Sequence, residues 1–573
     1  MGIPSYFSHV IRKYPSVISK LKTMCIKNKS STLLLKYSNK DRVDYKKVDR
    51  LYLDSNSIIY DSIVDLSYGI DKDEFESKLI QKVCLKLEEY IRMVSPNEMV
   101  YIAFDGIAPQ AKLKQQKTRR YKSWYMKQYD HRITSGADEE YIPNKTSWDT
   151  SAITPGTEFM NKLNLQIRYY FRNAKLFSTN SIIISGSDEE GEGEHKIMTH
   201  IRESDEKSIK KDNVFVYGLD ADLIMLTLNH LTYCPNLYLF RETPEFIKSI
   251  NKTLDPNENY VIDISKLSKS IESCIYGKDV DTSSDTKPCI EDYMFICFLL
   301  GNDFLPHFPS LNIRTIGMDY IIDTYRNIIL NRNIRIINNN GNADRGINWK
   351  HLRLLIRELA KNERANFMSE HKHRDRMEKR IRDNRDARNI DSDEKFEEYM
   401  MDSPILERPV EKYINPFDHG WESRYYDMLC NIDLNEIKRI DKSNKIVHRN
   451  EYSDIRKICN NYLEGLEWTY NYYTGFRTDW SWSYQYNYAP LLYDLQYIIP
   501  YSDGKEIIES ENIVSNPINT DVEQLSYTLP RSSSYLLPVP MQRSRNTSAS
   551  SVEFMNIEWA YCRYFWESHV LFK

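Results

Sequence analysis

The sequence predicts an α/β fold in which a central, mostly parallel sheet is flanked by helices. Between Leu51 and about Tyr325, short apolar runs alternate with helical patterns, as they do in βαβ units. Acidic residues follow the ends of several runs, at the edge where open parallel sheets bind ligands. With 573 residues, the chain exceeds what one hydrophobic core usually organises, so we expect a second region beside the sheet.

The predicted elements follow one another along the chain. We expect strands, each a short apolar run bounded by polar residues, at Leu51–Asp54, Met99–Phe104, Ser181–Ser185, Val214–Tyr217 and Leu237–Phe240. Helical patterns lie between them, at Glu74–Met93, Ile107–Tyr129 and Pro155–Asn173. Thr154 followed by Pro155 indicates an N-cap with proline at the first position of the third helix.

Composition indicates a globular protein of the cell interior. Hydrophobic residues make up 41% of the chain, charged residues 28%, and no apolar run is long enough to span a bilayer, so we expect no membrane contact. The nine scattered cysteines form no CxxC pair, which favours reduced thiols in a cytoplasmic protein. The net charge of −4 means that nucleic-acid affinity must come from local basic patches. Abundant Tyr, Asn, Ile and Lys suggest an AT-rich genome, such as that of a parasite or a large DNA virus.

Seven carboxylates at the C-terminal ends of apolar runs are the candidate catalytic residues. We expect five to follow strand ends directly and two to follow a short Gly-rich turn. Burying so many like charges together is costly unless cations neutralise them. The alternative is that each acid is an ordinary turn residue or helix cap. The candidates are Asp54, Asp105, Glu192, Glu194, Asp220, Asp222 and Asp303.

The spacing of two acidic pairs indicates the kind of cation. Glu192 and Glu194 are two residues apart, as are Asp220 and Asp222, and extended backbone would aim both acids of each pair the same way. Oxygen ligands without nearby cysteine suit magnesium, with manganese as the alternative. Two such ions about 4 Å apart would clamp the attacking water and the leaving oxygen of a phosphodiester.

A basic segment follows Asp105. Residues 111–122 contain six basic side chains, and Ile107–Gln128 contains no acid. On a helix, Lys112, Gln116, Arg119 and Arg120 fall on neighbouring turns and can converge on one anion. The alternative is a surface helix with unpaired charge, but the missing acids favour a phosphate pocket.

Aromatic side chains supply candidates for stacking on bases. Trp480 and Trp482 lie in an aromatic-rich stretch, and Tyr60 follows Asp54 by six residues. Bases stack on such rings without regard to sequence, although we expect most of these aromatics to be core. His195 and His307 flank the acids, but no Ser or Cys pattern accompanies them. We therefore interpret them as neighbours of the metal ligands or as structural residues, rather than as nucleophiles.

A second charged stretch runs from Leu352 to Arg388. It contains many arginines, including Arg374, interleaved with acids such as Asp375 and Glu378. This pattern is typical of a solvated helix, and guidance of phosphates is the alternative.

Several segments together resemble the XRN-type 5′→3′ exoribonucleases. They occur in the family's order over nearly the whole chain: MGIPSYF, LYLDSNSIIY, FDGIAPQAKLKQQKTRR, ITPGTEFM, GEGEHKIM, YGLDADLIML, GNDFLPHFPSL, YLEGLEWTYNYY and WSWSYQYNYAP. The resemblance implies a PIN/FEN-like nuclease core at residues 1–325. It also implies a mostly helical, aromatic-rich second region at residues 326–573 that encloses the active site, with a loop-rich segment at 516–551. The implied activity is processive removal of 5′ mononucleotides from single-stranded RNA bearing a 5′ monophosphate.

The resemblance also implies roles for single residues. The seven acids match the family's ligands for two magnesium ions, and Lys112, Gln116, Arg119 and Arg120 match its 5′-phosphate pocket. Asn56 lies in the first motif as a site neighbour. Tyr60 stands where the family usually carries a base-stacking histidine, so stacking is kept without the imidazole. Of the two tryptophans, Trp480 is the favoured stacking residue.

Two other functions compete with this interpretation. Flap endonucleases of DNA repair share clustered acids, but they follow the last acid with a glycine-rich helical hairpin, which PSLNIRTIGMDYIIDTY lacks. A non-catalytic RNA-binding homologue that has lost its metals is the second alternative, and the presence of every matched acid argues against it.

Overall fold

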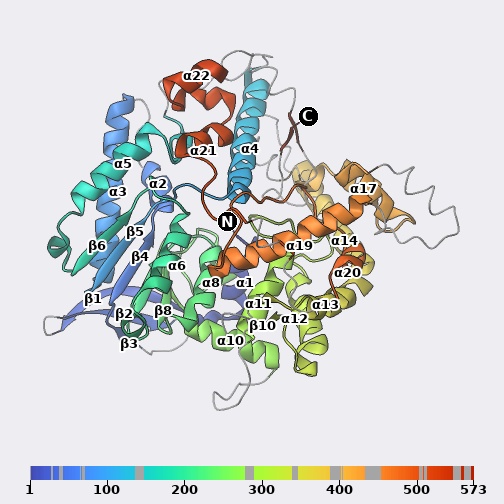
Figure 1. The fold of residues 1–573 in the computed structure, drawn as a ribbon, viewed down its shortest axis with the longest axis horizontal. Helices are drawn as coiled ribbons and strands as arrows, with labels where there is room; N and C mark the ends of the chain where they lie inside the picture. The colour runs from blue at the N-terminus through green and yellow to red at the C-terminus, as the bar shows by residue number, and fades with distance from the viewer. Residues whose placement is uncertain are drawn as a thin grey trace.

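The fold is described from a computed structural model (Figure 1). The structure describes residues 2–27, 30–37, 43–64, 66, 71–135, 148–277, 289–338, 346–387, 402, 404–432, 453–501, 507–508, 513–545, 557–559 and 570–572. No helix in these ranges is both long and apolar enough to cross a membrane.

A nine-stranded sheet forms the centre of the N-terminal half, in the order β3-β2-β1-β9-β8-β7-β4-β5-β6. The five strands β8, β7, β4, β5 and β6 are parallel, and β9, β1, β2 and β3 extend the sheet antiparallel. The α/β fold is therefore confirmed. The parallel strands are β4 (Arg50–Asp54), β5 (Met99–Ala103), β6 (Ser181–Ser185), β7 (Val214–Tyr217) and β8 (Leu237–Glu242).

The antiparallel extension was not predicted from the sequence. It consists of β1 (Ile18–Lys27), β2 (Ser30–Tyr37), β3 (Val43–Lys46) and β9 (Asn259–Asp263). Lysines and serines interrupt the apolar residues of β1 and β2, so neither strand reads as an uninterrupted apolar run. Strands with one solvated face carry such mixed patterns, whereas the buried parallel strands do not.

Helices cover both faces of the parallel strands. On one face, Leu51 and Leu53 of β4 pack with α2 (Asn56–Ile63), α3 (Lys72–Val94) and α5 (Glu158–Tyr170). On the other, Tyr52 packs with α6 (Gly193–Glu203), α8 (Asp222–Asn229), α10 (Ile264–Tyr276) and α11 (Ile290–Cys297). This alternation along β4 is the period-two pattern of a strand buried on both sides.

Two predicted helix starts need correction. α5 begins at Glu158 rather than Pro155, and its N-cap is Thr157, whose hydroxyl accepts a hydrogen bond from the Met160 amide at 3.3 Å. Gly156 has φ +87°, so the backbone cannot be helical there. α4 (Gln110–Ser135) also begins later than Ile107, and it continues beyond the predicted end at Tyr129.

Asp303 does not follow a strand, which corrects the prediction for that acid. The apolar run before it forms α11 and a short 3₁₀ helix, Phe298–Leu300. These residues are buried on all sides, and a fully buried run does not distinguish helix from strand by its periodicity.

The second region is mostly helical, as expected. Its core is continuous with the sheet's α8 face, because residues of α13 and α19 join the same hydrophobic cluster as β4 and α8. Helix α12 (Gly317–Ile328) spans the boundary between the two regions. The helices of the second region include α13 (Trp349–Lys361), α14 (Glu363–Ala387), α16 (Pro409–Ile414), α17 (Trp421–Cys430), α19 (Ser453–Thr474) and α20 (Leu492–Ile498).

Helix α14 is solvated on one side, as its charges predicted, and buried on the other. Arg374 is only 1% exposed, and its guanidinium binds Glu411, which is equally buried, at 2.8 Å. Arg408 is buried against the same carboxylate. Glu378 pairs with Arg408 and Lys412, so α14 is fastened to α16 by charges. Arg388 lies outside the described residues.

The segment 516–551 contains more helix than the loop-rich prediction allowed. It forms α21 (Asp521–Thr528), a 3₁₀ helix at Arg531–Leu536 and α22 (Val539–Arg545), and residues 546–551 lie outside the described part. Thr520 and Glu523 make a capping box at the start of α21. In Figure 1, α21 and α22 lie beside α4. The TxxE spacing was the overlooked signal in this Ser- and Pro-rich stretch.

Candidate active site

Three adjacent parallel strands deliver four of the acids to one edge of the sheet. Strand β4 lies between β7 and β5. Asp54 is the last residue of β4, Asp105 follows β5 by two residues, and Asp220 and Asp222 follow β7. Because parallel strands end at a common edge, these carboxylates converge as the sequence predicted.

Helix α6 brings two further acids to this edge. The amide of Gly193, at its first residue, donates a hydrogen bond to Asp105 Oδ1 at 2.8 Å. An ideal Cβ on Gly193 would lie 2.6 Å from Asp54 Oδ1, so only glycine allows this approach. The close contact places the N-terminus of α6, with its partial positive charge, against two carboxylates.

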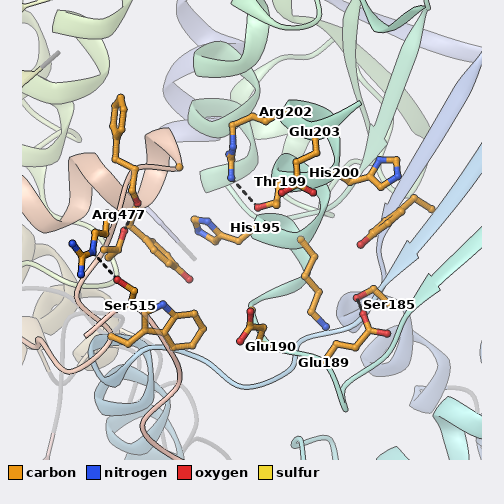
Figure 2. Close-up of a pocket in the computed structure, with 18 residues that line it drawn as sticks. Ser185, Glu189, Glu190, His195, Thr199, His200, Arg202, Glu203, Arg477 and Ser515 are labelled. Atoms are coloured by element: carbon orange, nitrogen blue, oxygen red, sulfur yellow. Dashed lines mark hydrogen bonds between the residues drawn. The ribbon is translucent and has the colours of Figure 1, made fainter. Parts of the chain in front are cut away.

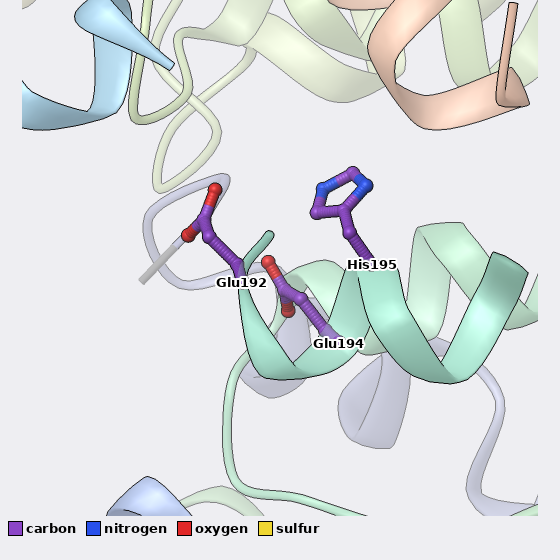
Figure 3. Close-up of side chains that lie close together, drawn as sticks. All are labelled: Glu192, Glu194 and His195. Carbon is purple, nitrogen blue, oxygen red and sulfur yellow. The ribbon is translucent and has the colours of Figure 1, made fainter. Parts of the chain in front are cut away.

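Glu192, Glu194 and His195 form a potential metal-binding group at the start of α6 (Figure 3). One ligand atom from each lies within 4.8 Å of the others. Glu192 is extended, with φ −72° and ψ 152°, but Glu194 already belongs to the first helical turn. The acidic pair therefore straddles a helix start, which corrects the expected extended arrangement. Asp222 is likewise the first residue of α8 rather than part of an extended segment.

Lys112 lies among the acids. Its ammonium is 2.5 Å from Glu192 Oε2 and 3.0 Å from Asp303 Oδ2. The hydroxyl of Tyr472 donates to the other oxygen of Glu192 at 2.6 Å. Lys112 thus joins α4 to the acidic cluster and brings Asp303, from beyond the sheet, into the same site.

Three of the other carboxylates, Asp54, Glu194 and Asp222, lie in surroundings that oppose their negative charge. Burial, and then the nearby Asp105, raises the pKa of Asp54 well above its usual range. Burial followed by Asp222 does the same to the pKa of Glu194, and burial raises the pKa of Asp222 to about 7. Glu194 Oε2 and Asp222 Oδ1 are buried without a hydrogen-bond partner among the described residues. An oxygen-rich, under-neutralised cluster of this kind fits a divalent cation such as magnesium or manganese.

Asn56 and Tyr60 lie on α2, directly after Asp54. The Asn56 side chain donates to Asp105 Oδ2 and accepts from the Asp105 amide at 3.2 Å. Asn56 therefore fixes the orientation of that carboxylate. Tyr60 is 41% exposed, which leaves its ring accessible.

The four predicted pocket residues on α4 do not share one environment. Lys112 binds the acids, whereas Gln116 is buried and its Oε1 has no partner in the described part of the chain. Arg119 is exposed. Burial opposes the charge of Asp303, but Lys112 and, to a smaller extent, Arg119 lower its pKa. Arg120 donates to Thr154 Oγ1 at 2.7 Å and to Thr528 Oγ1.

The structure places the two tryptophans in different surroundings. Trp482 is buried and stacks on Trp468 with ring centroids 5.3 Å apart. Trp480 lines a cavity of about 680 Å³ (Figure 2). This cavity also touches His195, next to Glu194, and Tyr472. A ring in contact with a cavity can meet a ligand, whereas a stacked core ring cannot.

Several site residues were missed from the sequence. Tyr472 binds Glu192, and its ring lies 3.7 Å, centroid to centroid, from that of His195. The hydroxyl of Tyr473 donates a hydrogen bond to the carboxylate of Asp222. The amide of Gly2 donates to Asp303 Oδ1 at 3.1 Å. All three lie in segments that the sequence marked as distinctive, but nothing in the spacing of residues so far apart revealed their contact with the acids.

Comparison with known proteins identifies relatives over most of the chain. Residues 1–243 match a family profile described as the XRN 5′-3′ exonuclease N-terminus, and residues 283–419 and 408–558 match one described as the Xrn1 helical domain. 5′-3′ exoribonuclease 1 of Saccharomyces cerevisiae is 25% identical over 94% of this chain, and that of Homo sapiens is 27% identical over 96%. 5′-3′ exoribonuclease 2 of Kluyveromyces lactis is 32% identical over 57% of this chain.

The matched part of each relative is the smaller part of its length. The alignments cover 40% of the Saccharomyces cerevisiae protein, 32% of the human protein and 36% of the Kluyveromyces lactis protein.

Proposed function

Because the chain belongs to the XRN family of 5′-3′ exonucleases, we propose that it is a 5′→3′ exoribonuclease. Its substrate is single-stranded RNA with a 5′ monophosphate, which it degrades processively to 5′ mononucleotides. The observation that carries this proposal is the contact between the acidic cluster and the basic helix α4, made by Lys112 with Glu192 and Asp303.

The acids suit two magnesium ions, with manganese as the alternative. The charge of Asp54 interacts with those of Asp105, Asp220 and Glu192. The charge of Glu194 interacts with those of Asp222 and Glu192, and that of Asp222 with Asp303. Bound divalent cations would activate the attacking water and neutralise charge on the phosphodiester. The chain's own part is to orient these carboxylates, through Asn56 at Asp105 and Tyr472 at Glu192.

The basic face of α4 supports recognition of the leading nucleotide. In this proposal Lys112, Gln116, Arg119 and Arg120 bind the 5′ phosphate, and Arg119 and Arg120 offer the planar forks that phosphate oxygens match. The buried Gln116 supplies a polar side chain that still has hydrogen-bonding capacity. Tyr60 and Trp480 are the stacking surfaces for bases, since both rings are accessible.

A substrate comparison tests the function and separates its alternatives. Three otherwise identical RNAs with a 5′ monophosphate, triphosphate or hydroxyl, and a branched DNA flap, are incubated with and without magnesium. The exoribonuclease releases mononucleotides from the monophosphate RNA only with metal. A flap endonuclease would instead cut the branched DNA, and a non-catalytic homologue would bind RNA and cut nothing.

A further inference from the structure

We propose that Gln524 and Thr528, on helix α21 of the second region, are positioning residues that hold the Asp105 loop and the arginine of the phosphate pocket in place. This inference rests on the proposed function. It assigns α21 to the active site, although Gln524 and Thr528 lie more than 400 residues along the chain from Ala108 and Arg120.

Gln524 bridges the loop that carries Asp105. Its Oε1 accepts from the Ala108 amide at 2.9 Å, and its Nε2 donates to the Gly106 carbonyl at 3.3 Å. The side chain is fully buried, so water does not compete for these groups. The side-chain amide of Gln524 therefore binds the backbone on both sides of Ile107, within the three residues that follow Asp105. A loop fixed in this way limits where the carboxylate of Asp105 can point.

Thr528 acts on Arg120, one turn further along α21. Arg120 Nη1 donates to Thr528 Oγ1, and Nη2 donates to Thr154 Oγ1 at 2.7 Å. The Thr528 hydroxyl donates to the Gln524 carbonyl at 3.0 Å, and that of Thr154 donates to the Ser151 carbonyl at 2.8 Å. Both hydroxyl protons are therefore engaged in these two bonds, and each hydroxyl oxygen accepts a hydrogen bond from the guanidinium.

This arrangement orients Arg120 without neutralising it. The two partners are uncharged, whereas a carboxylate in either place would form an ion pair that competes with phosphate. Burial and the neighbouring Arg119 lower the pKa of Arg120 to about 10, and that group remains cationic at neutral pH. With two neutral acceptors, the charge of Arg120 stays available to bind a phosphate.

Helix α21 is built to dock at this position. A Cβ on Gly156 would lie 2.8 Å from the Asp521 carbonyl oxygen, so the start of α21 packs directly on a glycine backbone. Further along, Lys117 lies over the Tyr527 ring at 4.6 Å, and Tyr121 donates to the Leu529 carbonyl at 3.4 Å. These contacts run along the same face of α4 as Arg120. The helix thus ties the loop after Asp105, the 154–156 turn and α4 together.

Thr528→Val tests the contact with Arg120, because it removes the hydroxyl and keeps the branched shape. We expect the ratio of kcat/KM for 5′-monophosphate RNA over 5′-hydroxyl RNA to fall about tenfold, since a hydrogen bond to a charged group is lost. The change should lie mainly in KM for the monophosphate substrate. Thr528→Ser restores the hydroxyl and should restore the ratio.

Gln524→Met tests the loop, because it keeps the length of the side chain and removes both hydrogen bonds. We expect the magnesium concentration at half-maximal rate to rise about tenfold, while the preference for the 5′ monophosphate is unchanged, since both substrates need Asp105. The two variants should therefore fail in different measurements.

Thr520→Ala is the matched control. It removes the capping box of the same helix but contacts neither the loop nor Arg120. It should lower the melting temperature while keeping both the 5′ selectivity and the magnesium requirement. If Thr528→Val and Gln524→Met behave like Thr520→Ala, α21 is only structural and the inference is wrong. If wild-type protein shows no preference for a 5′ monophosphate, the proposed function fails first, which the same assay reveals before any variant is compared.

Discussion

At the scale of single residues, Asp222 shows how burial prepares a carboxylate for a cation. Its Oδ1 has no partner among the described residues, and burial raises its pKa to about 7. Asp222→Asn keeps the shape and removes the charge. We expect hydrolysis of 5′-monophosphate RNA to fall at least about 100-fold, with RNA binding in EDTA retained.

The control for this substitution is Asp319→Asn. Asp319 is exposed and pairs with Lys13 at 2.6 Å, away from the acidic cluster. Its loss should leave the rate unchanged. Near-normal hydrolysis by Asp222→Asn would remove that residue from the set of metal ligands.

The two tryptophans should respond to alanine in opposite ways. Trp480→Ala should raise KM for RNA about tenfold or more, because base stacking contributes about 1 to 3 kcal/mol per base, and should leave the melting temperature nearly unchanged. Trp482→Ala should instead destabilise the protein by about 3 to 5 kcal/mol, since the ring is buried against Trp468. Steady-state kinetics and thermal melts of both variants check this. A KM effect confined to Trp482→Ala would reverse the assignment.

At this scale the sequence located the acids better than their neighbours. Asp54 and Asp105 could be placed because they follow apolar strands whose ends must share an edge. Tyr472 could not, because its contact with Glu192 joins residues 280 positions apart and depends on how α19 packs. The prediction for Lys112 was also incomplete. The spacing placed it on a basic helix but did not indicate its contacts with Glu192 and Asp303.

At the scale of elements, the junction of α14 and α16 depends on one buried carboxylate. Glu411 receives hydrogen bonds from Arg374 at 2.8 and 3.0 Å and from Arg408 at 3.0 Å. Although burial opposes the charge, Arg374 and then Arg408 lower the pKa of Glu411 to about 2. Glu411→Gln removes the charge that both buried guanidinium groups share, although Arg408 keeps its pair with Glu378. We expect it to destabilise the protein by roughly 3 to 5 kcal/mol at pH 7.

The effect of Glu411→Gln should depend on pH in a defined direction. A carboxylate with a depressed pKa stabilises the fold above its ordinary pKa of about 4.5, and this contribution is lost as the pH falls toward about 2. The gap in melting temperature between wild type and variant should therefore narrow between pH 5 and pH 3. Glu358→Gln, at the exposed pair with Lys361, should cost less than about 1 kcal/mol at either pH. An unchanged gap at pH 3 would contradict the ionised state of Glu411.

Element boundaries show where sequence patterns were decisive and where they were not. The run Val214–Tyr217 was predicted as a strand and is β7 with the same bounds, because a short buried run between turns has few other solutions. The buried side of α14 was not predicted, because charge spacing along one helix does not reveal that Arg374 meets a carboxylate on α16. Glu411 is 37 residues further along the chain.

At the scale of the whole molecule, the acidic site lies where the sheet and the second region meet. The hydrophobic core runs from β4 through α8 to α19, so the second region packs against the helices of the sheet and shares one core with them. The backbone amide of Gln110, at the start of α4, donates a hydrogen bond to the Trp480 carbonyl at 2.9 Å. The predicted parallel sheet was enough to place the acids. The packing of the second region against the sheet could not be predicted, because it depends on contacts between residues far apart in the chain, which periodicity does not encode.

Metal binding should therefore stabilise the entire protein. Without cations, burial and mutual repulsion raise the pKa values of Asp54, Glu194 and Asp222, which means that their charged forms destabilise the fold. A ligand that binds only the folded state at about 100 times its Kd adds about 2.7 kcal/mol. We expect saturating magnesium to raise the melting temperature by several degrees relative to EDTA at equal ionic strength.

The rise in melting temperature caused by magnesium should be larger at pH 8 than at pH 6. A carboxylate whose folded pKa is raised to about 7, as at Asp222, costs stability as the pH rises toward that value, and the cost is complete above it. Magnesium removes this cost and must displace a proton at pH 6 but not at pH 8. Asp222→Asn should raise the melting temperature in EDTA at pH 8 and lose most of the response to magnesium. An equal magnesium shift in wild type and Asp222→Asn would mean that the ion binds elsewhere, and that the acids at the sheet edge are not its ligands.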